Sequence, residues 1–354
     1  MAAPSSRLQT LTNTYLVPGA VDQVINHSPV TSRTIGNARK WNGVRLERAV
    51  KYKTTGLGGA FSGLTEFSTE DVATSIKLTY DLGSYEHPVV VPGLEKLLNN
   101  VSDTTATALV GYKIEEAKVE LADGVAQILF GNNNTEFNSF RDFADDGGQT
   151  ASIGGQSRTT YTALQGTDTA SGGTISLSKI RTLITSVGSV STVGARPTLA
   201  PTTETIWDLV ESLMTPTVQA NYEANGYPQV TMTSKAPIRN AELVGIQGFS
   251  SLVYAGLPIV ADERCTSQAF YEINEDRIDW YGAKDPDLMA VDLGDSKDLE
   301  TVYHKAPSKF HGFNWQPLMR PINQYSEVGH IYLFGQLVSW EPRRQGVLTG
   351  VTGV

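Results

Sequence analysis

The most regular pattern of apolar and polar positions lies in the segment DTTATALVGYKIEEAKVELADGVAQILFGN. Lysines, glutamates and an aspartate fill the gaps between apolar residues that recur at steps of three and four: Val110, Ile114, Ala117, Leu121, Val125 and Ile128. This spacing is typical of an amphipathic helix. We predict a helix over residues 103–130, about seven turns long. Ser102 or Asp103 is its expected N-cap, and Gly131 its expected left-handed C-terminal residue.

A period of two marks the segment before this helix. Ile76, Leu78 and Tyr80 alternate with polar residues, as in a strand with two different faces. The outgoing stretch GVRLERAVKYKTTG, the glycine-rich turn GLGGAFSG and the returning stretch SIKLTYDLGSYEHPVVV together predict a long β-hairpin from Val44 to about Val91. A lone hairpin is marginally stable in water, so this one requires a surface to lie on, such as a neighbouring subunit.

The rest of the chain gives shorter patterns. Residues 1–43 show little periodicity and are expected to form an extended arm. TETIWDLVESLMTPTV predicts a helix with Thr203 as its N-cap. From Ala236 to Trp280 we expect short strands, and HIYLFGQLVSWEPRRQGVLTGV predicts a strand, a bend at proline and a last short strand. SLSKIRTLITSVGSV predicts a helix with one apolar face: Leu177, Ile180, Leu183, Ile184 and Val187.

Composition narrows the class of protein. A chain of 354 residues suggests about two or three domains, or one elongated multi-part protein. Hydrophobic residues at 40% and charged residues at 18% indicate a folded chain. The single cysteine excludes a disulfide framework and any multi-cysteine metal site. Neither a membrane-spanning apolar run nor a signal peptide is apparent, so we expect a soluble protein made in a reducing cytosol, with no membrane partner.

The charge is distributed unevenly. The first 60 residues hold eight lysines and arginines against two acids, which leaves about −15 for the remainder of a chain with net charge −9. A basic segment on an acidic body points to an acidic partner, either another subunit or nucleic acid. An ordinary solvated strand with scattered charges is the alternative. The basic residues of the hairpin are Arg45, Arg48, Lys51 and Lys53.

The strongest candidate for chemistry is Cys265, which follows Asp262, Glu263 and Arg264 in YAGLPIVADERCTSQAFYEIN. The two acids would raise the pKa of the thiol, whereas Arg264 would lower it. No histidine stands in a motif with this cysteine, so we interpret it as a packed side chain at the end of a short strand. An enzyme with an unrecognised site around Cys265 remains the alternative.

Metal-binding and nucleotide-binding sites have even less support in the sequence than a reactive Cys265. His304 and His311 are too isolated for a metal site. The glycines of the hairpin turn match no dinucleotide fingerprint, and no phosphate loop is present. The adjacent acids Asp145 and Asp146 are expected in a loop. We therefore expect no catalytic, cofactor-binding or metal-binding residues.

Several segments resemble the major capsid proteins of tailed bacteriophages, which have the Hong Kong 97-type fold. SYEHPVVVPGLEKLLNN and the helix ending ILFGN resemble that family's hairpin return and spine helix, and IGGQSRTTYTAL resembles its linking segment. RPTLAPTTETIWDLVESLMTP and YAGLPIVADERCTSQAFYEIN resemble parts of the axial domain, and GQLVSWEPRRQGVLTGV resembles the closing strands. Together these segments cover most of the chain from Val44 onward.

The resemblance implies an α+β fold with the family's parts in order. The N-terminal arm would be residues 1–43 and the extended β-hairpin loop residues 44–96. The remaining parts would be the peripheral domain with its spine helix 103–130 (97–175), the axial domain (176–300) and the returning strands of the peripheral domain (301–354).

The function implied is that of a major capsid protein, not an enzyme. Copies would self-assemble as pentamers and hexamers into the icosahedral head of a virion, inside the host cytoplasm. Portal protein, a decoration protein and weakly held double-stranded DNA would be partners. The family often carries a scaffolding segment ahead of the arm; because this chain starts at Met1 without one, a separate scaffolding protein, or none, is expected.

Two further implications concern contacts between subunits. The candidate contact residues are Arg45, Arg48, Lys51, Lys53, Asp262, Glu263 and Arg264. The last three stand at the end of a short strand, where they could bond either backbone groups or a neighbouring subunit. Some relatives form a covalent cross-link from a loop lysine, but nothing in this sequence selects one. An encapsulin-like nanocompartment shell that encloses cargo enzymes is the alternative with the same fold.

Overall fold

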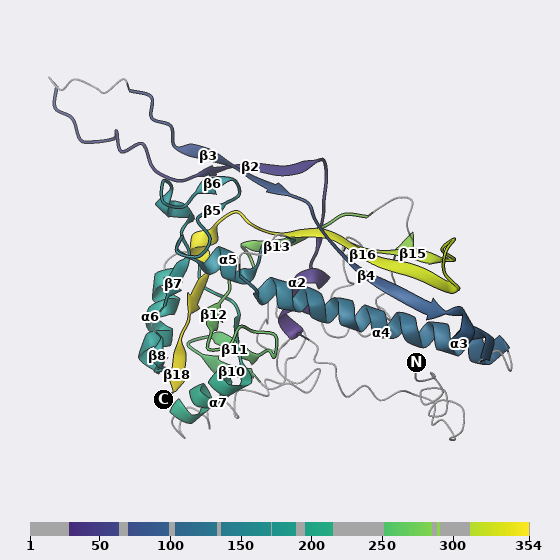
Figure 1. Cartoon of the computed structure of the whole chain (residues 1–354). Coiled ribbons are helices and arrows are strands. Elements are labelled where there is room, and N and C mark those ends of the chain that lie inside the picture. The colour runs from purple at the N-terminus through teal and green to yellow at the C-terminus, as the bar shows by residue number, and fades with distance from the viewer. Residues whose placement is uncertain are drawn as a thin grey trace, which may run out of the picture.

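The fold consists of two β-sheets, one long helix and a hairpin that projects away from them (Figure 1). The computed structural model describes the following residues: 28–63, 70–98, 103–132, 136–170, 172–188, 195–214, 251–284, 289–290 and 312–353. None of the helices in these ranges combines the length and apolarity needed to cross a lipid bilayer.

The first sheet is built around β16 (Ser326–Ser339), the longest strand described. Ten of its residues pair antiparallel with β4 (Gly83–Pro92), and β15 (Phe313–Met319) and β13 (Ile278–Gly282) pair with it as well. Two short strands, β1 (Arg39–Lys40) and β14 (Met289–Ala290), complete the sheet. Buried apolar residues from alternate positions of β16, among them Ile331, Leu333 and Leu337, form its contribution to the core.

The long helix α4 (Asp103–Phe130) packs along β4, as Figure 1 shows. Its bounds confirm the helix predicted from the sequence, and its buried stripe includes Ala117, Leu121, Val125 and Leu129. Gly124 allows the close approach, because a Cβ there would lie 2.6 Å from the hydroxyl oxygen of Tyr85 on β4. Two details differ: Gly131 does not have a positive φ, and Ser102 lies outside the described residues.

The second sheet contains the strands in the order β10, β11, β9, β12, β17, β7. Their bounds are Ser251–Tyr254, Leu257–Ala261, Ala200–Thr202, Phe270–Glu272, Gly346–Leu348 and Thr167–Thr169. Two helices with strongly apolar faces, α6 (Leu177–Val187) and α7 (Glu204–Leu213), contact it. Ile180, Leu183, Ile184 and Val187 are all buried, as the helical pattern predicted. Thr203 occupies the N-cap position of α7 but makes no side-chain capping bond.

The two sheets exchange strands between distant parts of the chain. β13 belongs to the first sheet although it falls within 176–300, and β17 belongs to the second although it falls within 301–354. β4 falls within the range 44–96 expected to form the hairpin loop, yet it pairs with β16 instead. The domain ranges drawn from the sequence stay predictions, and the strands are not confined to them.

The described part of the N-terminal arm contains a helix that the sequence analysis missed. In α2 (Pro29–Gly36), the hydroxyl of Ser28 accepts a hydrogen bond from the backbone N–H of Thr31 at 3.2 Å, and proline stands at the first helical position. Arg33 on this helix forms an ion pair with Glu275. The arm is therefore anchored to the body at this point, rather than extended throughout.

Several short elements connect these layers. They are α3 (Gly93–Leu98), α5 (Phe140–Ala144), β5 (Ser152–Ile153), β6 (Gln156–Ser157), β8 (Gly173–Thr174), β18 (Val351–Gly353) and the 3-10 turns η1 (Thr162–Leu164) and η2 (Pro342–Arg344). The hairpin proper consists of β2 (Arg45–Lys51) and β3 (Ser75–Asp81) in antiparallel register.

A carboxyl group is buried in the middle of the second sheet. Glu272 on β12 is fully buried, and neither of its side-chain oxygens accepts a hydrogen bond from the described residues. Burial raises the pKa of Glu272 well above its usual value, although the positive charge of Arg196 opposes the shift. The folded state therefore holds this group protonated at pH values where the unfolded chain has already lost the proton.

We expect Glu272→Gln to change how stability depends on pH. In the unchanged protein the contribution of Glu272 is fully present below its unfolded pKa and is lost as pH rises toward its folded pKa. The free energy of unfolding of the variant should therefore rise relative to the unchanged protein between pH 5 and pH 8, measured by urea unfolding. Glu263→Gln, which alters an exposed carboxyl group nearby in sequence, should follow the unchanged protein. Parallel curves for Glu272→Gln and its parent would contradict this expectation.

Candidate functional site at the root of the hairpin

The hairpin exposes apolar side chains beyond its paired strands. Leu57 is 41% exposed and Phe61 is 69% exposed, on the outgoing segment after β2. In Figure 1 this segment projects well away from the two sheets. Apolar side chains displayed on an extended projection indicate a surface that another molecule covers.

The root of the hairpin, by contrast, is packed into the body. Leu78 and Tyr80 on β3 are buried, which confirms the two-faced pattern predicted for this strand. The hydroxyl of Tyr80 donates to the backbone oxygen of Ser339 at 2.6 Å, and its ring meets Trp340 edge to face at 5.4 Å. Burial raises the pKa of Tyr80, so its hydroxyl stays a donor.

A short turn supports β3 from the side. The backbone N–H of Thr79 donates to the oxygen of Gly154 at 3.0 Å, and the side chain of Gln156 donates to the oxygen of Lys77 at 3.1 Å. Gly154 has φ +56°, and a Cβ at this position would lie 3.0 Å from the Cβ of Leu78. The turn between β5 and β6 therefore fixes the direction in which the hairpin leaves the body.

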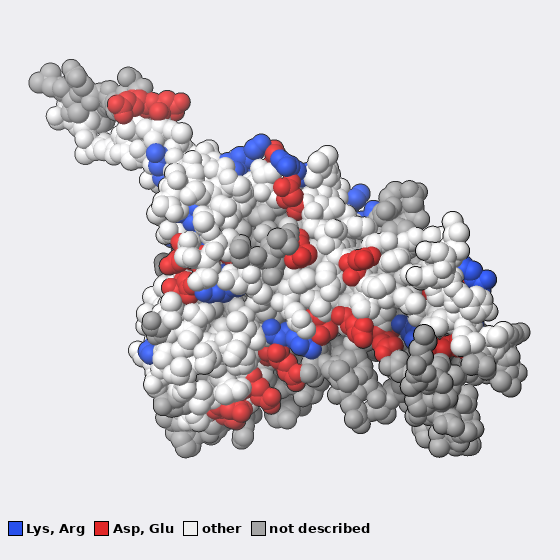
Figure 2. Space-filling model, in the orientation of Figure 1, with Lys and Arg blue, Asp and Glu red and all other residues white. Residues whose placement is uncertain are grey.

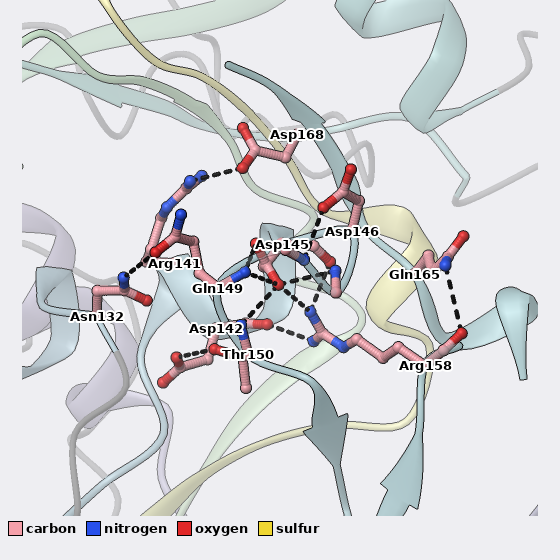
Figure 3. Close-up of polar contacts among 12 residues, drawn as sticks. Asn132, Arg141, Asp142, Asp145, Asp146, Gln149, Thr150, Arg158, Gln165 and Asp168 are labelled. Atoms are coloured by element: carbon pink, nitrogen blue, oxygen red, sulfur yellow. Dashed lines mark hydrogen bonds and ion pairs between the residues drawn. The ribbon is translucent and has the colours of Figure 1, made fainter. Parts of the chain in front are cut away.

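A buried polar cluster holds the loop that carries this turn (Figure 3). The carboxylate of Asp145 accepts backbone N–H groups from Gly147 at 2.8 Å and Thr150 at 2.9 Å, and also from Gln149. The guanidinium of Arg158 donates to the backbone oxygen of Asp145 at 2.6 Å and approaches its carboxylate at 3.3 Å. Both side chains are fully buried. Burial lowers the pKa of Arg158, and the negative charge of Asp145 opposes that shift.

The helix before this loop is tied into the same cluster. Ser139 and Asp142 form a capping box at the start of α5, in which each side chain bonds the other residue's backbone N–H. Arg158 also donates to the backbone oxygen of Asp142. Arg141 pairs with Asp168 of β7 at 2.6 Å. The cluster thus joins α5, the loop and the second sheet into one support for the hairpin root.

Three carboxylates of this region lie close together. Asp145, Asp146 and Asp168 have oxygens within 4.8 Å of one another, which is a spacing that could suit a cation. However, Arg158 contacts the carboxylate of Asp145 and Arg141 contacts that of Asp168, so guanidinium groups already supply the positive charge. As expected from the sequence, Asp145 and Asp146 lie in a loop, and the arrangement is that of a structural cluster.

The first group of candidate contact residues, Arg45, Arg48, Lys51 and Lys53, lies on the hairpin. Arg45 forms an ion pair with Asp81 at 2.6 Å on its exposed surface. Arg48 lies over the ring of Trp340 at 5.6 Å, and Lys53 over that of Tyr52 at 5.4 Å. Lys51 is exposed. Their contacts with other subunits stay predictions.

The second group of candidate contact residues lies at the end of β11 and just after it. Asp262 is 2% exposed and accepts hydrogen bonds from the hydroxyl of Ser28 at 2.6 Å and from the backbone N–H of Arg264 at 3.0 Å. It therefore bonds groups of its own chain, which is one of the two alternatives that the sequence left open. Burial raises its pKa. Arg264 forms an ion pair with Asp123 of α4 and remains partly exposed. Glu263 is exposed, and its predicted role stays a prediction.

Cys265 is a packed side chain, as the sequence predicted. The thiol is buried and lies 3.8 Å from the backbone oxygen of Ala269. Burial, reinforced by the negative charge of Asp262, raises its pKa well above the usual value. A thiol held protonated is a poor nucleophile. His304 and His311 lie outside the described residues.

The chain and its structure can be compared with those of known proteins. The chain matches no protein-family model and no curated protein. Its structure, however, is similar to a chain of the Cyanophage A-1(L) capsid, with a TM-score of 0.71 and 13% identity over 97% of this chain and 98% of that one. A chain from the capsid of an empty GTA particle matches with a TM-score of 0.54 and 10% identity, over 97% and 96%.

An encapsulin from Synechococcus elongatus PCC 7942 also aligns, over 99% of this chain and 96% of that one at 10% identity, with the lower TM-score of 0.49. The cyanophage likeness extends over nearly the whole of both chains. The chain therefore has the fold of tailed-bacteriophage major capsid proteins, the Hong Kong 97-type fold that its sequence resembles.

Proposed function

We propose that the chain is the major capsid protein of a tailed double-stranded DNA bacteriophage, with a structural and not a catalytic role. Copies assemble as pentamers and hexamers into an icosahedral head. One observation carries the proposal: the likeness to the cyanophage capsid chain extends over nearly the whole of both chains. A likeness over nearly the whole length of both chains is what a shared role as a shell subunit would produce.

The physical basis of assembly would be many weak contacts. A subunit that touches several neighbours gains stability by multivalency, so no single interface has to be strong. The exposed apolar side chains Leu57 and Phe61 of the hairpin become favourable to bury only against another copy. The hairpin would therefore contribute a large share of the contact surface between copies.

The remaining partners follow from this role. A portal protein, a separate scaffolding protein and a decoration protein would meet the shell during assembly in the host cytoplasm, and the finished protein would reside in the virion. The net charge of −9 would keep contacts with packaged DNA weak, because strong binding to phosphates requires clusters of basic residues.

Light scattering of the purified protein tests the proposal. We expect particles of many copies, or rings that convert to particles when a scaffolding protein is supplied. A monomer or dimer under both conditions would contradict it. Small closed shells that enclose protein cargo and no DNA would favour the nanocompartment alternative.

A further inference from the structure

A pocket of about 420 Å³ lies where the hairpin leaves the body. Three regions of the chain that are far apart in sequence line it: strands β1 and β2, the start of β13 with the turn before it, and the segment around η2. The lining residues are Arg39, Arg48, Ala49, Val50, Lys51, Asp276, Arg277, Asp279, Trp340, Glu341, Arg343 and Arg344. Six of these side chains are basic and three are acidic, so the pocket carries a net positive charge.

Ion pairs inside the pocket leave part of this charge without a counterpart. Arg39 pairs with Asp279 at 2.9 Å, and Arg277 pairs with Glu341 at 2.9 Å, with Arg344 at 3.8 Å from the same carboxylate. Three cations, Arg48, Lys51 and Arg343, form no ion pair with any carboxylate in the described part of the chain. Like charges that converge on a hollow favour the entry of an anion.

The pocket also has an apolar wall. Arg48 lies over the ring of Trp340, and Ala49 and Val50 also line the pocket. A guanidinium placed on an indole ring keeps its charge available at the ring edge while covering apolar surface. The pocket therefore suits a segment that carries both a carboxylate and an apolar side chain, rather than a small inorganic anion alone.

The other end of the same hairpin has this composition. Glu70 and Asp71 are exposed on the returning segment, and Phe61 and Leu57 are exposed on the outgoing one. Acidic side chains gather near the far end of the projection in Figure 2. The regular pairing of β2 with β3, from Arg45↔Asp81 to Lys51↔Ser75, directs this end away from the pocket of its own chain. An occupant from the hairpin must therefore come from a second copy.

We propose that the pocket takes the acidic end of the hairpin of a neighbouring copy, with Glu70 and Asp71 against Lys51 and Arg343 and an apolar side chain against Trp340. The proposal rests on the proposed function, since it names an interface of the assembled shell. Each copy would give one end of its hairpin and receive another, a head-to-tail contact that closes into rings. Double-stranded DNA fits less well, because three carboxylates line the same pocket.

Charge reversal on each side tests this pairing. Lys51→Glu with Arg343→Glu, and separately Glu70→Lys with Asp71→Lys, should each raise the protein concentration needed for assembly by about tenfold or more, because like charges then face each other. The four changes combined should restore most of the assembly seen with the unchanged protein. Arg181→Glu with Lys284→Glu changes two exposed cations outside the pocket by the same charge and should assemble normally.

The outcomes separate this inference from the proposed function. If the unchanged protein assembles and all reversed variants assemble equally well, the pocket is not an interface. If both reversed variants fail to assemble and the variant with all four changes also fails, the proposed pairing is wrong. Circular dichroism of Lys51→Gln with Arg343→Gln then shows whether these variants are misfolded or have only lost a contact. If short duplex DNA binds the unchanged protein and not the pocket variant, while assembly is normal, the pocket serves DNA and the proposal is overturned. Failure of the unchanged protein to assemble at all would instead contradict the proposed function.

Discussion

Replacing Arg158 by alanine should lower the free energy of unfolding of the subunit by about 3–5 kcal/mol, the range found when one partner of a buried ion pair is removed. The substitution leaves the fully buried carboxylate of Asp145 without its guanidinium and removes the hydrogen bonds that Arg158 donates to the backbone oxygens of Asp142 and Asp145. Urea unfolding of the subunit, followed by circular dichroism, measures the loss. Because the cluster supports the hairpin root, assembly should also fail at temperatures where the subunit remains folded.

Two variants control this prediction. Arg181→Ala removes the same kind of side chain from an exposed position on α6, and its effect should stay within about 0.5 kcal/mol. Asp145→Ala with Arg158→Ala should cost less than the sum of the two single changes, because no unpaired charge remains buried. A loss below about 1 kcal/mol for Arg158→Ala would show that the cluster is not the support described here.

Shortening the hairpin should abolish assembly while the subunit stays folded. Residues 52–74 can be replaced by Asn-Gly, because Lys51 and Ser75 lie opposite each other in register and a two-residue turn joins such a pair. In the described part of the removed segment, Tyr52 meets Tyr161 of the body edge to face at 5.0 Å, and the loss of this contact is the expected cost to the subunit. The free energy of unfolding should therefore fall by only about 1 kcal/mol. Light scattering should detect no particles.

The matched control keeps the length of the hairpin but replaces its exposed apolar side chains. Leu57→Ser with Phe61→Ser should weaken assembly without abolishing it, since the acidic end of the segment remains. If the shortened protein formed shells as readily as the unchanged one, the hairpin would not be a contact between copies, and the function proposed for it would have to be abandoned.

The elements that the sequence predicted well are those whose signal is local. The long helix kept a regular spacing over 28 residues, so its bounds could be placed at Asp103 and Phe130. Leu78 and Tyr80 revealed the inward face of β3 because alternation directly reports burial on one side of a strand. The apolar face of α6 was equally clear.

The errors arose where partners are distant in sequence. The hairpin return could not be divided into β3 and β4 from the sequence, because only pairing with β16, more than two hundred residues later, makes β4 part of the first sheet. The helix α2 is too short to show periodicity, although Ser28 followed by Pro29 is a start signal that could have been used. Gly131 was expected in a left-handed conformation from its residue type alone.

The candidate site shows the same limit. The excess of positive charge on the hairpin was visible in the sequence, and for this reason Arg48 and Lys51 were predicted to contact other subunits. Nothing in the sequence indicated that Trp340 and Arg343 would stand beside them, or that Arg158 would be buried against Asp145. Asp262 was chosen as a contact candidate because it is polar. Its partner, the hydroxyl of Ser28 at the start of α2, lies 234 residues earlier in the chain, and the sequence showed no sign of that contact.

Negative-stain electron microscopy of the purified protein is the most direct test of assembly into a capsid. We expect rings of five and six copies, or closed icosahedral shells, formed by the protein alone or with its scaffolding protein. Discrete monomers or dimers in every field, with and without that scaffold, would contradict it.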